Sequence, residues 1–303
     1  MSSSLLISRE RLAQLNQLQD GPAWFQLSGH LLVIVVAGVL WRQPLLPLWL
    51  RLPCLLLSGV GLATCFAGLH ECCHRTAFRS KTTNDRVAWL MGLLSFYNAT
   101  FYRRYHQWHH RFTHQPGLDP ELDDPVPTTP IGYALEISGI TWWLGKVRGY
   151  QRLLFGDLSQ FPYLSPELIP HVRRSVRQQF VLYAIALAAS FWQANGFLLW
   201  SWLLPLAVGQ PFLRVVLLAE HSGCSFSADG LANTRTTLTV APVRWLMWNM
   251  PFHAEHHLYP SFPFHALAQA HLELAPRLQH LDNGYLAVHR QLLQRLTSLA
   301  PSP

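Results

Sequence analysis

The chain has 303 residues, of which 50% are hydrophobic and only 13% are charged, and it contains 12 Trp and 16 Phe. Such a low charged fraction is unusual for a water-soluble domain and is typical of a membrane protein. The formal net charge of +7 could indicate a nucleic-acid partner, but the arginines stand beside apolar blocks instead of forming a separate basic region. We therefore expect membrane flanks and no nucleic-acid binding.

The five cysteines are odd in number and contain no CxxC pair, which argues against both a disulfide framework and a zinc finger. We expect reduced thiols, with metal ligation by Cys72 and Cys73 as an alternative. The N-terminal stretch has no apolar signal region before Asp20, so we expect no cleaved secretory leader. Residues 1–23 are expected to form an amphipathic segment with a short helix that Gly21-Pro22 ends.

Two apolar blocks, 24–41 and 45–69, follow each other across a short turn at 42–44. At 1.5 Å per residue the first block approaches the roughly 30 Å hydrocarbon core of a bilayer. In the second block the uninterrupted span is expected at 54–69. Together they predict a transmembrane hairpin. His30 lies inside the first block, where a lone polar side chain usually makes packing contacts, and it receives no function.

The middle of the chain, 87–177, is less uniformly apolar. The block 87–101 is too short for a confident crossing, so we expect it to lie at the membrane interface, as we do for 131–145. The proline-rich segment 115–130 carries Asp119, Glu121, Asp123 and Asp124. We expect these acids on a solvated surface, with partner docking or a position behind the metal site as the alternative. The basic residues between 146 and 177 favour a cytoplasmic location.

Two further apolar blocks, 180–194 and 197–219, are separated only by Asn195 and Gly196, which predicts a second hairpin. Pro205 and Pro211 are expected to kink its second helix. The predicted fold is an all-α integral membrane protein with four transmembrane helices as two hairpins and a cytoplasmic helical cap. The main membrane domain is placed at 24–275 and a tail helix at 276–303. Both termini are expected in the cytoplasm.

Three His-rich motifs are spaced along the chain: HECCH at 70–74, HQWHH at 106–110 and HAEHH at 253–257. Positions i, i+3 and i+4 share one face of a helix. An HxxHH pattern is expected about 0.04 times by chance in a chain of this composition, so two copies indicate a function. One more histidine follows the last apolar block. The nine candidate metal ligands are His70, His74, His106, His109, His110, His221, His253, His256 and His257.

Nine imidazoles exceed the three or four that one zinc site uses, and they fit two metal ions with four or five ligands each. Imidazole suits iron, copper, nickel and zinc alike, so the spacing does not identify the metal. Ligating imidazoles need hydrogen-bond acceptors behind them. The candidates are Glu71, Glu220, Asn249 and Glu255, with ordinary solvation as the alternative. His114 is expected behind the site or in solvent, and the surface is expected for His171, His265, His271, His280 and His289.

The three motifs resemble the His boxes of the integral-membrane fatty acid desaturase superfamily, which includes related hydroxylases and carotenoid-modifying oxygenases. The resemblance covers roughly residues 24–275 and includes the continuation HLYPSFPFHAL. It implies a non-haem di-iron centre, with O2 as co-substrate, that removes hydrogen from an unactivated alkyl chain of a lipid. His221 is similar to an additional ligand of membrane desaturases. The acyl-CoA desaturases have an Asn one turn before that His, where this chain has Leu217.

The leading hypothesis is therefore a fatty acyl desaturase. A hydroxylase or ketolase of a lipid, an alkane or a carotenoid is an alternative, because the motifs do not separate these reactions. A metal transporter is a distant alternative, since transporters place polar ligands at mid-membrane. The sequence has no Cys cluster for an iron–sulfur centre and no GxGxxG. We therefore expect a separate electron donor, a ferredoxin or a small cytochrome with its reductase, steered by the Arg-rich cytoplasmic face.

Overall fold

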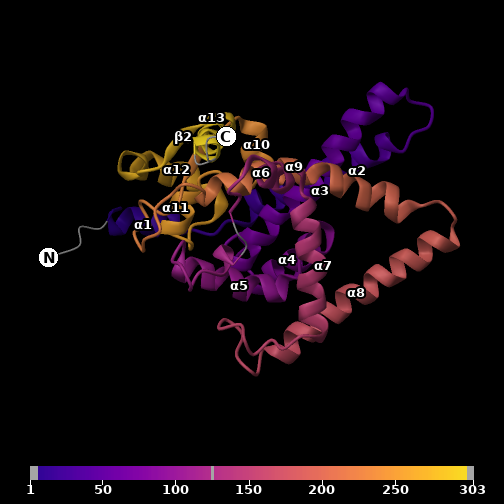
Figure 1. The fold of residues 1–303 in the computed structure, drawn as a ribbon, viewed down its shortest axis with the longest axis horizontal. Helices are drawn as coiled ribbons and strands as arrows, with labels where there is room; N and C mark the ends of the chain where they lie inside the picture. The colour runs from indigo at the N-terminus through magenta and orange to yellow at the C-terminus, as the bar shows by residue number, and fades with distance from the viewer. Residues whose placement is uncertain (1–5, 124–125, 299–303) are drawn as a thin grey trace.

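Two long helical hairpins extend to one side of the molecule (Figure 1). The computed structural model describes residues 6–123 and 126–298. The first hairpin consists of α2 (Asp20–Trp41) and α3 (Leu48–His74). The second consists of α8 (Ile169–Trp192) and α9 (Leu204–His221), and α9 continues a π-helical turn at Leu199–Leu203. The turn ends two residues before Pro205, where the sequence predicted a kink. Proline has no N–H, so it interrupts the regular hydrogen bonding of the helix.

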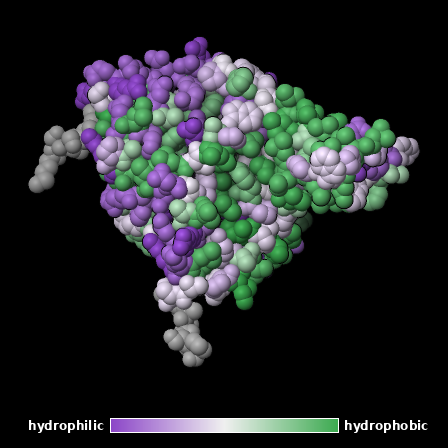
Figure 2. Space-filling view, turned by 90° about the horizontal axis from the view of Figure 1, so that it is seen from above, coloured by the Kyte–Doolittle hydropathy of each residue, from purple (hydrophilic) through white to green (hydrophobic). Residues whose placement is uncertain are grey.

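Three of these helical stretches are long and apolar enough to cross a membrane: Asp20–Trp41, Leu48–His74 and Leu199–His221. Helix α8 is as long, but it carries three arginines in its first turns and is not among them. Figure 2 shows apolar side chains gathered over the side on which the hairpins extend, while hydrophilic side chains cover the opposite side. The fourth span, the pairing into two membrane hairpins and the cytoplasmic cap stay predictions.

Short helices and turns form the body at the base of the hairpins (Figure 1). The block 87–101 is divided between α4 (Lys81–Ser95) and α5 (Ala99–Phe112), because Phe96 adopts a left-handed conformation with φ of 63° and ends α4. The remaining elements of the body are α1 (Arg9–Leu15), η1 (Pro120–Leu122), α6 (Pro130–Ser138), α7 (Ile140–Phe155), α10 (Ala241–Leu246), α11 (His253–Leu258), α12 (Phe264–Leu274), η3 (Ala275–Arg277) and α13 (Tyr285–Ser298).

A two-stranded parallel sheet joins β1 (Thr236–Leu238) to β2 (Leu281–Asn283), with Thr236 opposite Leu281. The prediction of an all-α fold missed this sheet, since strands of three residues leave too short a pattern to recognise. Strand β1 precedes the HAEHH motif and β2 precedes α13, so the sheet ties the C-terminal helix to the segment that carries the third His box.

The N-terminal segment differs from the prediction. Helix α1 ends at Leu15, and Gly21-Pro22 lies in the first turn of α2 instead of ending α1. Proline fits the first turn of a helix because the N–H that it lacks would have no partner within the helix. Ile7 and Leu15 are buried against Phe262 and Leu267, so the described part of this segment packs on the protein. Residues 1–5 of the segment and 299–303 of the tail helix lie outside the described residues.

Candidate metal centre

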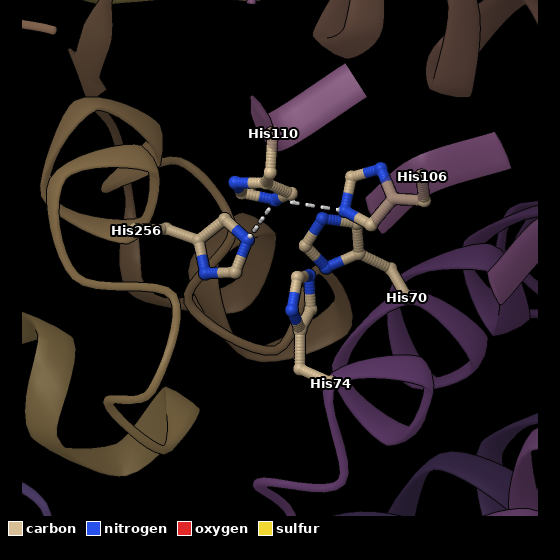
Figure 3. A group of neighbouring side chains, drawn as sticks. All are labelled: His70, His74, His106, His110 and His256. Carbon is tan, nitrogen blue, oxygen red and sulfur yellow. Dashed lines mark hydrogen bonds between the residues drawn. The ribbon is translucent and has the colours of Figure 1, made fainter. Parts of the chain in front are cut away.

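All nine candidate histidines come together at the body end of the long helices. Five of them form the first group (Figure 3), in which one ring nitrogen of each lies within 4.8 Å of the others: His70, His74, His106, His110 and His256. The Nε2 atom of His110 lies 3.0 Å from that of His106 and 3.1 Å from that of His256. Helices α3, α5 and α11 each supply histidines to this group.

The second group lies beside the first and contains His109, His221 and His257, again within 4.8 Å. His253 joins it, because its Nε2 atom lies 3.2 Å from that of His221 and 3.1 Å from that of His257. The HQWHH and HAEHH motifs each divide their histidines between the two groups. The i, i+3, i+4 spacing therefore provides two adjacent sites from one helix face, and the rings of His110 and His257 stack at 4.1 Å across the boundary.

The donor set fits metal ions. Two neutral imidazole nitrogens about 3 Å apart can share only one proton, so repeated contacts of this kind leave lone pairs facing each other. Nitrogens at about 2.1 Å from one metal and at right angles to each other would be about 3.0 Å apart, which matches the contacts observed. The Nε2 atoms of His70, His74 and His109 are buried, and no protein atom in the described residues accepts or donates a hydrogen bond to them.

Burial keeps most of these imidazoles neutral. For five imidazoles outside the long apolar helices, burial lowers the pKa well below the usual value, and neighbouring imidazoles lower that pKa further. They are His106, His110, His253, His256 and His257. A metal ion binds the unprotonated imidazole, so such an environment favours metal binding over protonation.

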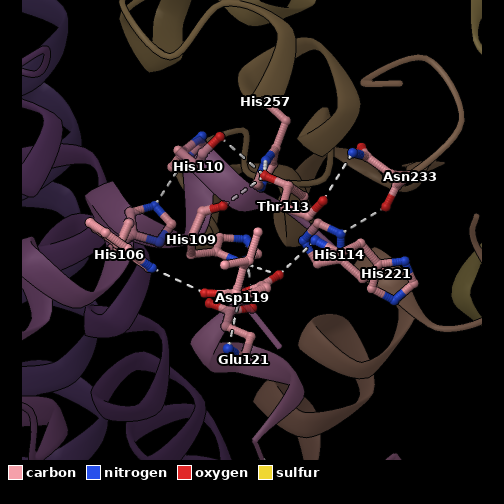
Figure 4. Close-up of polar contacts among 12 residues, drawn as sticks. His106, His109, His110, Thr113, His114, Asp119, Glu121, His221, Asn233 and His257 are labelled. Carbon is pink, nitrogen blue, oxygen red and sulfur yellow. Dashed lines mark hydrogen bonds and ion pairs between the residues drawn. The ribbon is translucent and has the colours of Figure 1, made fainter. Parts of the chain in front are cut away.

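Asp119 holds His109 in place (Figure 4). Its carboxylate oxygens lie 2.9 and 3.0 Å from Nδ1 of His109, which donates to them and leaves Nε2 for the second group. The same carboxylate accepts the backbone N–H groups of His114 at 2.6 Å and Glu121 at 3.0 Å. Asp119 is only 2% exposed. The predicted surface location is therefore wrong for this residue, and the alternative position behind the metal site is the one observed.

The charges of this contact reinforce each other. Burial alone would lower the pKa of His109, but the carboxylates of Glu121 and Asp119 outweigh it and raise that pKa. Burial alone would raise the pKa of Asp119, yet the hydrogen bond from His109 and those from the backbone lower it. The carboxylate is thus ionised and acts as an acceptor for the imidazole. Asp124, in the same acidic segment, lies outside the described residues.

Two further acceptors were missed by sequence reasoning. The carbonyl oxygen of Asn233 accepts from Nδ1 of His221 at 3.1 Å, and the Thr113 hydroxyl lies 3.1 Å from Nδ1 of His257 (Figure 4). Thr113 stands one helical turn after His109, a spacing that could have identified it. Asn233 carries no such signal, because it lies in a loop and contributes a backbone atom.

The four predicted acceptors occupy different positions. The Oε2 atom of Glu220 lies 3.5 Å from Nε2 of His253, and its buried Oε1 atom has no partner in the described residues. Glu255 turns away from the metal groups and bonds to Thr236 and to Nδ1 of His271, the latter at 2.5 Å. Its contacts join α11 to β1 and α12, which orients the whole His-bearing helix.

Glu71 and Asn249 meet at the backbone of Phe264. The Glu71 carboxylate accepts from the Thr76 hydroxyl at 2.7 Å and from the Phe264 N–H at 3.1 Å. The Asn249 side chain donates to the Phe264 carbonyl at 3.0 Å. Their bonds therefore fix the end of α3 and the turn before α11 to the start of α12.

Arg103 clamps the end of α3 to α4 and α5. Its guanidinium donates to the carbonyls of Cys73 at 3.2 Å and Cys72 at 3.4 Å, and it pairs with Asp85 at 2.6 Å. Asp85 also pairs with Arg75. Cys72 and Cys73 are buried free thiols that are not in either metal-binding group, and all five cysteines are unpaired, as expected.

Several histidines outside the boxes are not where we expected them. The predicted surface location is wrong for His289, which is buried and contacts Tyr133 and the Val215 carbonyl, and for His271, which contacts Glu255. His114 is buried behind the site. His171 is exposed as predicted, while His265 and His280 are half-buried.

His30 is a buried packing residue. Trp248 donates its indole N–H to Nδ1 of His30, at 3.1 Å, so the opposite nitrogen carries the proton and donates to the Gly61 carbonyl at 2.8 Å. The imidazole is fully satisfied and links α2, α3 and the turn that leads to α11.

Comparison with known proteins supports this chemistry. A family model described as fatty acid desaturase, a family known for its use of iron, matches residues 46–288. The chain is 26% identical to the sn-1 oleoyl-lipid 12-desaturase of Picosynechococcus over 80% of its own length and 74% of that protein. It is 26% identical to the human sphingolipid delta(4)-desaturase/C4-monooxygenase DES2 over 76% of its own length and 65% of that protein. The chain belongs to the fatty acid desaturase family, and it is therefore an oxidoreductase and not the metal transporter kept above as a distant alternative.

Proposed function

We propose that this protein is a multi-pass membrane enzyme that uses two iron ions and O2 to remove hydrogens from an unactivated alkyl chain of a lipid. The observation that carries the proposal is the division of nine histidines into two adjacent groups of five and four. One group alone would suit a single metal ion. Two groups sharing helices α5 and α11 are what a pair of ions requires.

A pair of iron ions, when bound, would supply the oxidising power needed to break an aliphatic C–H bond with O2, which protein side chains lack. The chain's own residues hold and orient the ligands. Asp119, the Asn233 carbonyl and Thr113 fix the rings of His109, His221 and His257. His109 is buried and His221 and His257 are half-buried, which limits the access of water and protects an oxidising centre from side reactions.

Aromatic side chains of α3 and α5 contact the first group. Tyr102 stacks on His106 with ring centroids 5.1 Å apart, and Phe66 lies 6.3 Å from His70. Phe66 also contacts Tyr97 and Tyr102. These side chains offer the apolar surface against which an alkyl chain would lie as it approaches the histidines from the membrane.

The reaction needs electrons from outside. Forming one double bond while O2 is reduced to two water molecules requires two electrons and two protons beyond those of the substrate. We propose a separate donor, a ferredoxin or a small cytochrome with its reductase, that docks on the cytoplasmic face. The positive charge of that face, with basic residues in α7 and at the start of α8, supports attraction of an acidic donor.

Hydroxylation is the second candidate, because the human relative is named as both a desaturase and a C4-monooxygenase. The same hydrogen removal can be followed by insertion of oxygen. Ketolase activity on a lipid or carotenoid would show as a carbonyl product. Product analysis separates these outcomes: a double bond without added oxygen supports the desaturase, and a hydroxyl or carbonyl supports the alternatives.

The test is lipid and product profiling of cells that express the wild-type chain or the His256→Ala variant, with iron and zinc measured on the purified proteins. We expect a new unsaturated acyl product and about two iron ions per chain, both strongly reduced in the variant because His256 belongs to the first group. His171→Ala, at an exposed position on α8, is the matched control and should keep both. One zinc ion per chain without iron would contradict the proposal.

A further inference from the structure

An open groove of about 930 Å³ lies between α4 and the first turns of α8, outside the metal centre. Trp89 of α4 forms one wall, and α8 forms the other. The residues that line it are Trp89, Ile169, Pro170, Arg173, Arg174, Arg177, Gln178, Val181 and Leu182. In the proposals above, its residues enter only through the positive charge at the start of α8.

The groove concentrates positive charge. Arg173 and Arg174 precede Arg177 by four and three residues, so the three guanidiniums are neighbours on one side of α8. The lining residues, all in the described part of the chain, include no carboxylate. The Nη2 atom of Arg173 donates to the Gly156 carbonyl at 2.6 Å, while its buried Nε atom has no partner in the described residues. The three positive guanidiniums repel one another, and an anion bound in the groove would reduce that repulsion.

The carboxylate in the adjoining hollow is engaged elsewhere. A smaller hollow of about 180 Å³ shares Trp89 with the groove and contains Asp85. That carboxylate already accepts hydrogen bonds from Arg75 and Arg103. The guanidiniums of Arg174 and Arg177 therefore face the groove as exposed donors.

One end of the groove continues into an apolar surface. Val181 and Leu182 are 57% and 38% exposed, and Ile185, one turn further along α8, is 59% exposed. Trp89 opposite them is the residue type that gathers at membrane interfaces. A ligand that fits along the whole groove must combine a negative group at Arg174 and Arg177 with a hydrocarbon part beside Val181 and Leu182.

We propose that this groove binds an anionic glycerophospholipid of the membrane, with its phosphate at the arginines and its acyl chains along α8. Guanidinium groups bind phosphate through paired, charge-assisted hydrogen bonds, and basic pockets between membrane helices suit anionic head groups. An acidic protein matches the charge, but it would not fill a concave site that continues into exposed apolar side chains. The proposal depends on the membrane location of the chain and not on the reaction that it catalyses.

The test measures lipid retention by the purified full chain in detergent, using native mass spectrometry during titration with phosphatidylglycerol or phosphatidylcholine of identical acyl chains. The wild type should retain phosphatidylglycerol preferentially. The double variant Arg174→Gln/Arg177→Gln should lose at least about tenfold in that affinity, since each cation near an anionic lipid contributes on the order of 1 kcal/mol. Phosphatidylcholine retention should not change.

Arg9→Gln/Arg290→Gln is the matched control, because it removes two exposed charges away from the groove. Arg173 is left intact, since its bond to Gly156 holds the loop before α8. A second variant, Val181→Gln/Leu182→Gln, should also lower phosphatidylglycerol retention if the acyl chains lie there. Thermal unfolding and iron content show that each variant remains folded.

Four outcomes would overturn the proposal. The first is equal retention of the two lipids by the wild type. The second is a loss of phosphatidylglycerol affinity in Arg9→Gln/Arg290→Gln as large as that in Arg174→Gln/Arg177→Gln. The third is displacement of phosphatidylglycerol by an equal concentration of inorganic phosphate. The fourth is a groove variant that keeps its lipid but loses turnover with the electron donor, which would assign the groove to an acidic protein.

Discussion

Asp119 and His109 meet although ten residues separate them, and no periodic pattern links the two. His109 is on α5, while Asp119 stands in a loop and caps the short η1 helix. In the sequence, Asp119 is one of several acids among prolines, which is the usual composition of a solvated loop. Only the folded chain shows that the loop turns back beneath the helix and brings one of these carboxylates to the second metal group.

We predict that Asp119→Asn weakens metal binding about 10- to 100-fold, the usual effect of removing a hydrogen-bond acceptor from a ligating imidazole. The amide keeps the shape of the side chain, but it has only one acceptor oxygen and no negative charge. It therefore holds the proton on Nδ1 of His109 less firmly, and Nε2 is less available to bind a metal. The measurement is iron bound per chain during titration with a competing chelator. Asp123→Asn changes an exposed acid four residues away and should leave binding unaltered. Wild-type affinity in Asp119→Asn would contradict the role given to this contact.

That the nine histidines would gather could be predicted, for a physical reason. Helical spacing fixes which side chains share a face, so His106, His109 and His110 had to point in similar directions. What the spacing could not predict is how they divide between two groups, since that depends on the positions of α3, α9 and α11 around α5. The hydrogen-bond partners of Glu71 and Glu255 were also unpredictable, because adjacency to a histidine on a helix places a side chain on a different face.

At the scale of whole elements, the metal centre depends on how α3 crosses α9. Gly59 and Gly209 meet at this crossing: a Cβ atom on Gly59 would lie 2.2 Å from the Pro205 carbonyl oxygen, and one on Gly209 would lie 2.0 Å from that of Gly59. From the crossing, 11 residues lead to His70 and 12 lead to His221. At 1.5 Å per residue both helices travel about 17 to 18 Å, so both deliver their ligands at one level.

We predict that Gly209→Ala separates these two helices and destabilises the protein by about 1–3 kcal/mol, because its methyl group would meet rigid backbone atoms. Metal content should fall with stability, since His221 moves relative to His70. The measurements are thermal unfolding in detergent and iron per chain. Gly149→Ala, on α7 with nothing within 4 Å of the added Cβ, is the matched control. Unchanged stability and iron content in Gly209→Ala would show that the close crossing is not needed.

The helices were predictable to the extent that their apolar residues form long blocks. The blocks 24–41 and 197–219 appear in the structure as parts of α2 and of the π-helical turn with α9. The break of 87–101 at Phe96 and the start of α2 at Asp20 were less accessible, because they depend on local backbone conformation. The contact between Gly59 and Gly209 was not visible in the sequence, where both are single glycines in apolar helices and their partners lie far along the chain.

The molecule as a whole has an apolar side and a hydrophilic side. Both hairpin turns, 42–47 and 193–198, lie on the side away from the body, and hydrophilic side chains cover the body (Figures 1 and 2). The basic residues of α7 and the first turns of α8 lie toward the base of the hairpins. Positive residues beside membrane helices favour the cytoplasm. We propose that the same polarity places the His groups at the membrane boundary, where a lipid substrate and a water-soluble electron donor could both reach them.

This polarity leads to a topology prediction that single-cysteine labelling can test. In a Cys54→Ser background, where the other native thiols are buried, cysteines introduced at the exposed positions Gln43 and Gln193 should react with an impermeant maleimide added to intact cells. A cysteine at exposed Gln279, in the body, should react only after the membrane is permeabilised. If Gln43 and Gln193 are labelled from opposite sides, α8 does not cross and the second hairpin is wrong. If Gln279 is labelled in intact cells, the body faces outward, away from a cytoplasmic electron donor.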